Sequence, residues 1–142
     1  MLRRYVDAYE SGDVSNLAEV LREDARLVMP PYLEWYEGRV SIVTFAEAFM
    51  VPGSPGLVTC GGMPTKANMQ PAVAWYLQQP TEPTFRALSV DVLRIEDGKI
   101  AEIISLSSPA VFSLRPFAHA LRAASSSVAT LASVVHRSGP AR

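Results

Sequence analysis

The segment Met29-Pro30-Pro31-Tyr32-Leu33-Glu34-Trp35-Tyr36-Glu37-Gly38 places two consecutive prolines and three large aromatic residues at the expected end of a strand. Paired prolines continue neither a sheet ladder nor a helix, so the backbone there is stiff and turned. A rigid turn can hold Tyr32, Trp35 and Tyr36 as the walls of a pocket rim. Because large aromatic residues more often pack a core than contact a ligand, packing under a loop is the alternative.

The residues before this segment predict two short helices and a strand. Apolar residues recur at helical spacing from residue 2 to residue 9, and Ser11-Gly12 is a typical helix end. Asp13 can cap a second helix. Apolar residues then alternate with other residues from Ala25 to Met29, which is typical of a strand that leads into the aromatic segment.

The residues after it predict a third helix and two hairpins. Residues 39–50 would form the helix and cover the open face of a sheet. Residues 52–62 are mainly turn-forming and predict a loop beside the pocket mouth, either a moving flap or a plain connection. One hairpin is expected around residues 68–71, and the other at Glu96-Asp97-Gly98-Lys99, which contains the preferred Asp-Gly dipeptide.

This order of elements, together with three stretches of sequence, resembles the SnoaL-like family of the nuclear-transport-factor-2 superfamily. The stretches are RYVDAYESGDVSNLAEVLREDARLVMPPYLEWYEGR (residues 4–39), MPTKANMQPAVAWY (residues 63–76) and ALSVDVLRIEDGKIAEIISL (residues 87–106). Within the family, the chain is most similar to the SnoaL-like domain at the C-terminus of extracytoplasmic-function RNA polymerase sigma factors. The resemblance implies an α+β fold: a cone-shaped, strongly bent antiparallel sheet wraps around a long helix, and two N-terminal helices close the cone.

The turn of the first hairpin departs from the family pattern. Related sequences commonly have glycine there, whereas this chain has Met69. The exchange predicts either a different turn type or an apolar side chain held at the pocket rim.

We expect two regions, a SnoaL-like cone domain at residues 1–112 and a basic amphipathic tail at residues 113–142. No acidic residue follows Phe112, whereas four arginines do, so a basic tail follows an acidic body. Apolar residues at helical spacing after Pro116 predict a helix interrupted by a run of serines. It would dock on the acidic body, on a second subunit, or on RNA polymerase or sigma-factor surfaces; the alternative is a frayed, disordered terminus.

Charge and cysteine content exclude several classes of function. The net charge is −1, which argues against direct nucleic-acid binding by the cone. The single cysteine, Cys60, cannot form an internal disulfide, and no hydrophobic run has the length of a membrane span or the flanks of a signal peptide. We therefore expect a cytoplasmic protein that does not contact membranes. His119, His136 and Cys60 lack metal-ligand spacing, so neither a metal nor another cofactor is expected.

Asp91 is the candidate catalytic residue. It stands in an otherwise apolar strand, where burial would raise the pKa of its carboxyl and prepare it as a general base. The alternative is a surface aspartate, paired with Arg86 or Arg94. The expected ligand pocket is lined by aromatic and apolar side chains: Tyr9, Met29, Tyr32, Trp35, Tyr36, Phe49 and Trp75.

The resemblance implies two alternative functions. The first is a regulatory domain of a sigma factor, which would bind a small apolar molecule or the RNA polymerase or sigma-factor core regions, with a homodimer as one assembly. The second is a small enzyme of cyclase, isomerase or hydrolase type, which would use a carboxylate general base. Related sigma-factor domains often have histidine where Asp91 stands, and an Asp-Pro pair where Ser108-Pro109 stands. Because the second carboxylate is missing and an aromatic rim suits binding, the first function is favoured.

Overall fold

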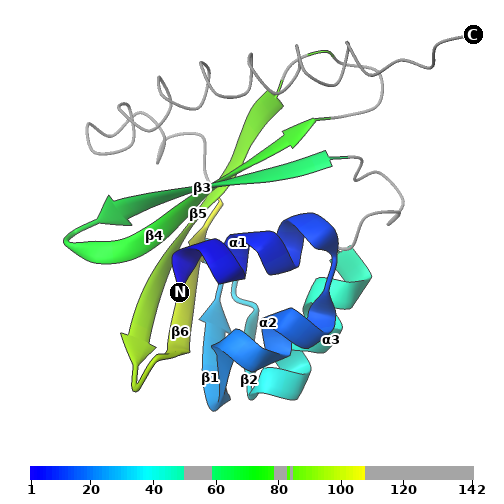
Figure 1. Ribbon diagram of the computed structural model, residues 1–142. Helices are drawn as coiled ribbons and strands as arrows, with labels where there is room; N and C mark the ends of the chain where they lie inside the picture. The colour runs from blue at the N-terminus through cyan, green and yellow to red at the C-terminus, as the bar shows by residue number, and fades with distance from the viewer. Residues whose placement is uncertain (50–58, 79–82, 84, 108–142) are drawn as a thin grey trace, which may run out of the picture.

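The computed structural model describes residues 1–49, 59–78, 83 and 85–107 (Figure 1). Its helices are α1 (Leu2–Ser11), α2 (Val14–Val20) and α3 (Arg39–Phe49). Its strands are β1 (Leu21–Val28), β2 (Trp35–Glu37), β3 (Thr59–Ala67), β4 (Gln70–Gln78), β5 (Phe85–Glu96) and β6 (Lys99–Leu106). The expected tail at residues 113–142 and residues 52–58 of the expected loop lie outside the described residues, whereas residues 59–62 of that loop are wrong as a loop, because they begin β3.

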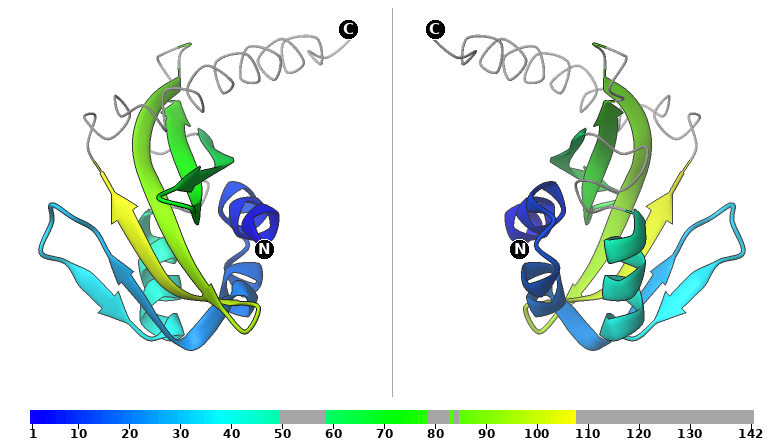
Figure 2. Two further views of the ribbon diagram at one scale, coloured as in Figure 1. Left: turned by 90° about the vertical axis from the view of Figure 1, so that its left-hand side faces the viewer. Right: turned by 90° about the vertical axis from the view of Figure 1, so that its right-hand side faces the viewer.

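The strands form one six-stranded sheet in the order β2-β1-β6-β5-β4-β3. All neighbouring strands are antiparallel except β1 and β6, which are parallel. The pairing of β5 shifts register opposite Trp75/Tyr76 and again at Arg94/Ile95, and such bulges increase the local twist and bend of a strand. Figure 2 shows β5 curving along its length, with α1 and α2 on the concave side of the sheet. The predicted α+β fold with a bent sheet is confirmed.

Local sequence sets the junction between the two N-terminal helices. Gly12 adopts the left-handed conformation, with φ 66°, and its N–H is directed at the last carbonyls of α1. The Asp13 side chain then accepts a hydrogen bond from the backbone N–H of Asn16 at 3.0 Å, which caps α2. This sharp junction allows both helices to pack over the same face of the sheet.

The aromatic segment forms a strand that the sequence did not predict. The chain turns at Pro30 and Pro31, where the peptide bond is cis, and Tyr32 N–H donates to Met29 O at 2.8 Å. Trp35–Glu37 then returns antiparallel to β1, with Trp35 opposite Val28 and Tyr36 opposite Leu27. The prolines therefore end β1 as expected, but they reverse the chain into an edge strand instead of a free rim.

The main core lies between the helices and the concave face of the sheet. Its largest fully buried side chains are Tyr5, Leu17, Leu21, Ile42, Trp75, Leu93, Ile100 and Ile103. Trp75 fits against Gly62 on β3 so closely that a Cβ on that glycine would lie 2.6 Å from the indole ring. The large indole is thus accommodated by the absence of a side chain on the neighbouring strand.

The β3–β4 turn has the geometry of an Asn-Gly hairpin without the glycine. Asn68 and Met69 have φ values of 49° and 64°, and a type I′ turn requires positive φ at both central residues. Met69 is 96% exposed, so its side chain is not packed at a pocket rim. An L-residue with a side chain is strained in this conformation.

We predict that Met69→Gly raises the free energy of unfolding by about 1 kcal/mol, because glycine relieves the strain and the exposed side chain contributes little. Urea denaturation measures the change. Met69→Ala is the matched control, since alanine keeps the Cβ and should bring no gain. Equal stabilisation by alanine and glycine would show that the backbone conformation is not the cause.

Candidate functional site

Asp91 projects from β5 into the interior of the cone and is 5% exposed. The Tyr5 hydroxyl on α1 donates to its Oδ2 at 2.8 Å, and Trp75 Nε1–H on β4 donates to the same oxygen at 2.7 Å. Within the described part of the chain, Oδ1 has no hydrogen-bond partner. Among the described residues, one oxygen of this buried carboxyl group therefore accepts two hydrogen bonds and the other accepts none.

Burial raises the pKa of the Asp91 carboxyl, while the nearby Ser105 side chain and the hydrogen bonds from Tyr5 and Trp75 oppose the rise only in part. Burial and the Asp91 charge also raise the pKa of Tyr5 well above its ordinary value, so the phenol keeps its proton. The surface alternative for Asp91 is wrong, and Arg94 instead pairs with Glu96 and Glu102. The side chain of Arg86 lies outside the described residues. The catalytic role of Asp91 stays a prediction.

Three aromatic rings fill the space around this carboxylate. Ring centroids lie 5.0 Å apart for Tyr5 and Tyr9, 6.0 Å for Tyr5 and Trp75, and 5.2 Å for Tyr9 and Trp75. These are the spacings of rings in direct contact. The interior beside Asp91 is therefore occupied by packed side chains.

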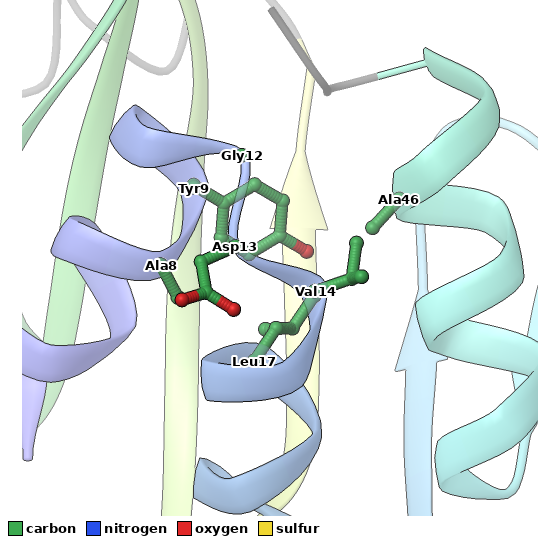
Figure 3. A pocket seen from close by; sticks show the side chains of 7 residues that line it. All are labelled: Ala8, Tyr9, Gly12, Asp13, Val14, Leu17 and Ala46. Atoms are coloured by element: carbon green, nitrogen blue, oxygen red, sulfur yellow. The ribbon is translucent and has the colours of Figure 1, made fainter.

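A small hollow opens where α1, α2 and α3 meet (Figure 3). Its volume is about 10 Å³, room for about one water molecule. The residues that line it are Ala8, Tyr9, Gly12, Asp13, Val14, Leu17 and Ala46. Tyr9 lines the hollow and also contacts Tyr5 and Trp75, the two donors to Asp91. Access from the hollow to the carboxylate therefore requires Tyr9 to move.

A larger, open groove lies on the β1–β2 hairpin; we call it the hairpin groove. Its volume is about 330 Å³, and it is lined by Arg26, Val28, Met29, Pro30, Tyr32, Leu33, Glu34 and Trp35. Tyr32, Leu33 and Trp35 are 62%, 96% and 56% exposed. The Arg26 guanidinium lies 5.8 Å from the centre of the Trp35 ring, a cation–π contact. Adjacent exposed apolar side chains of this kind mark interaction surfaces.

The structure does not bring the seven predicted ligand-binding residues together. Tyr9 and Trp75 lie in the cone interior, and Met29 packs against that core while also lining the hairpin groove; Tyr32 and Trp35 line the groove and are exposed. Tyr36 packs on Phe45 of α3, with ring centroids 4.7 Å apart. Phe49 ends α3, and its side chain lies outside the described residues.

Strand alternation explains this separation. Successive side chains of a strand point to opposite faces, so Tyr36 lies toward the core with Leu27, while Trp35 points outward with Val28. The sequence analysis also missed Tyr5 as a donor to Asp91. Its position four residues before Tyr9 places both rings on one face of α1, and that spacing was the available signal.

Other charged side chains form ion pairs on the surface. Arg22 pairs with Asp24 at 2.6 Å and also contacts Glu96, while Arg94 lies 3.4 Å from Glu102. No group of three or more His, Cys, Asp or Glu residues within the described ranges could hold a metal ion. In the same part of the chain, every helix is too short or too polar to cross a membrane.

Comparison with known proteins identifies a family and one protein that is similar over part of its length. The sequence profile of the family described as SnoaL-like domain matches residues 2–103. The ECF RNA polymerase sigma factor SigG of Mycobacterium tuberculosis is 37% identical over 78 residues, which are 55% of this chain and 20% of that protein. The chain therefore matches only about a fifth of the length of this curated relative.

Solved structures share the fold. A proposed ketosteroid isomerase from Kribbella flavida has a TM-score of 0.59 and 22% identity, covering 75% of this chain and 73% of that one. An NTF2-like protein of unknown function from Mesorhizobium loti has a TM-score of 0.56 and 20% identity, covering 75% and 86%. At these identities the likeness extends to the fold alone.

We predict that the stability difference between Asp91→Asn and the parent chain depends on pH. Because burial raises the pKa of Asp91, the folded state binds this proton more tightly than the unfolded state, whose aspartate titrates near 3.8. The stabilisation from the bound proton is complete below that value and is lost as the pH rises through the raised pKa. The asparagine variant has no such loss.

Urea unfolding of both proteins from about pH 3 to about pH 8 measures the difference. The free energy of unfolding of Asp91→Asn minus that of the parent should increase across the window and then level off. A constant difference, or one that falls with pH, would show that the pKa of Asp91 is not raised.

Proposed function

The chain belongs to the SnoaL-like domain family, and from this premise we propose that it is a regulatory domain that binds a partner protein segment. The partner class is the core of an extracytoplasmic-function sigma factor, as the similarity to SigG suggests. The binding surface is the hairpin groove, and the observation that carries the proposal is the contrast between this open groove and the packed aromatic rings beside Asp91.

The groove has the chemistry of a protein-binding surface. Tyr, Trp and Arg are enriched among residues that dominate binding energy, and Tyr32, Trp35 and Arg26 all line this groove. The rings of Tyr32 and Trp35 are largely solvent-exposed, so a partner would remove apolar surface from water. Glu34 and Arg26, which also line the groove, supply opposite charges for orienting a partner.

The cone interior supports binding of a small apolar molecule less well. The hollow beside Tyr9 holds about 10 Å³, whereas ligand pockets measure roughly 300 to 1,000 Å³. A ligand there would have to displace Tyr9 and separate packed aromatic rings. A protein partner on the groove needs no such rearrangement.

An enzyme is the second candidate, and Asp91 favours it. The carboxyl is buried, its pKa is raised, and Oδ1 is free of hydrogen bonds within the described residues, as a general base requires. Tyr5 and Trp75 occupy Oδ2, so Oδ1 would take the proton from a cyclic ketone or polyketide-like substrate. The substrate would enter only after Tyr9 has moved.

We predict that Trp35→Ala weakens binding of the SigG-type sigma factor lacking its SnoaL-like region by about tenfold or more, because a central aromatic anchor is lost. Isothermal titration of that partner into the full chain measures the effect. Trp35 is 56% exposed, so the substitution should leave the fold intact.

Val40→Ala is the control, since Val40 is an apolar residue on α3 that is 79% exposed and lies outside the groove lining. Unchanged affinity in Trp35→Ala, or an equal loss in Val40→Ala, would contradict the proposal. Turnover of a cyclic ketone that is lost in Asp91→Asn and retained in Trp35→Ala would favour the enzyme instead.

A further inference from the structure

The described chain ends beside the hairpin groove. The backbone N–H of Ser107 donates to the carbonyl oxygen of Pro30 at 3.5 Å, and Pro30 lines the groove. Strands β6 and β1 are parallel, with Ile104 opposite Val28, so both strands finish at the same end of the sheet. Figure 2 shows the tip of β6 at the same end as the β1–β2 turn. The residues after Ser107 therefore start at the edge of the groove.

The sequence that follows suits this surface. Residues 108–117 read Ser-Pro-Ala-Val-Phe-Ser-Leu-Arg-Pro-Phe, with four large apolar side chains, one arginine and no acidic residue. The groove offers the exposed rings of Tyr32 and Trp35 and the exposed Leu33 to apolar side chains. Glu34 and the exposed ring of Trp35 can each receive the arginine, through an ion pair or a cation–π contact.

We propose that residues 108–117 dock intramolecularly in the hairpin groove, with Val111, Phe112 and Leu114 against the aromatic side chains. An extended chain advances about 3.3 to 3.6 Å per residue, so this segment can reach every residue that lines the groove. Its tether gives it an effective concentration on the order of millimolar, so weak contacts suffice for occupancy. The regulatory role rests on the proposed function: the docked segment would compete with the partner for the groove and so regulate its binding.

Acrylamide quenching of Trp35 in the full chain tests the docking. The signal of Trp35 is isolated as the difference between the parent and its Trp35→Phe counterpart, because Trp75 is fully buried. Combined Val111→Ser, Phe112→Ser and Leu114→Ser substitutions should raise the quenching constant of Trp35 about twofold, as expected when a tethered segment of millimolar affinity is released. Phe112→Leu alone should retain the low value, since it preserves the apolar contact.

The matched control is the combined variant Leu121→Ser, Val128→Ser and Leu131→Ser, which alters apolar residues beyond the segment and should not change the quenching. Equal quenching in the parent and the first serine variant would overturn the proposal. Quenching of the parent that rises on dilution would also overturn it, because a second copy would then be the occupant. Trp35 that is shielded from acrylamide only after the partner is added would also overturn the proposal, because the partner would then be the occupant of the groove.

The two proposals can fail separately. If the Trp35 quenching constant is higher in the serine variant than in the parent but no sigma factor binds, the docking proposal stands and the proposed function is contradicted. If sigma-factor binding depends on Trp35 but the parent and the serine variant are quenched equally, the proposed function stands and the docking proposal is contradicted. If both hold, the serine variant should bind the partner about twofold more tightly, since the competing segment is gone.

Discussion

The hydrogen bonds to the buried carboxylate of Asp91 connect the elements that close the cone. Tyr5 comes from α1, Trp75 from β4 and Asp91 from β5, so one acceptor oxygen joins the N-terminal helix to two strands of the sheet. A buried carboxylate without donors would be very costly, which makes both bonds necessary once Asp91 is placed inside. Gly62 then leaves room for the indole that supplies one of them.

This arrangement determines where the molecule is open. Tyr5, Tyr9 and Trp75 pack around the carboxylate, so described side chains fill the space beside it. Within the described residues, the outward side chains of the β1–β2 hairpin instead present exposed aromatic rings. The hairpin groove on the outside of the sheet can therefore bind a partner, while the side chains inside the cone form the hydrophobic core. That division is the physical basis for favouring a partner-binding domain over an enzyme.

Much of the fold was predictable from short-range signals. The Gly12 helix end, the Asp13 cap and the Asp97-Gly98 turn all depend on residues adjacent in sequence, and the structure has each of them. The site was less predictable because its contacts are distant in sequence. Tyr5 and Asp91 are 86 residues apart, and no local pattern states that they meet. The inward or outward direction of Trp35 depends on its register with Val28, which the sequence of the aromatic segment alone does not specify.

A double-mutant cycle on Tyr5→Phe and Asp91→Ala, read by urea denaturation at neutral pH, tests the central claim most directly. Phenylalanine keeps the ring and removes the donor, while alanine removes the acceptor. If the Tyr5 bond to Asp91 holds α1 on the sheet, the two losses should be coupled by about 0.5 to 3 kcal/mol, the range for residues that share one hydrogen-bond network. Losses that add to within about 0.5 kcal/mol would contradict the account, because the hydroxyl and the carboxylate would then stabilise the cone independently.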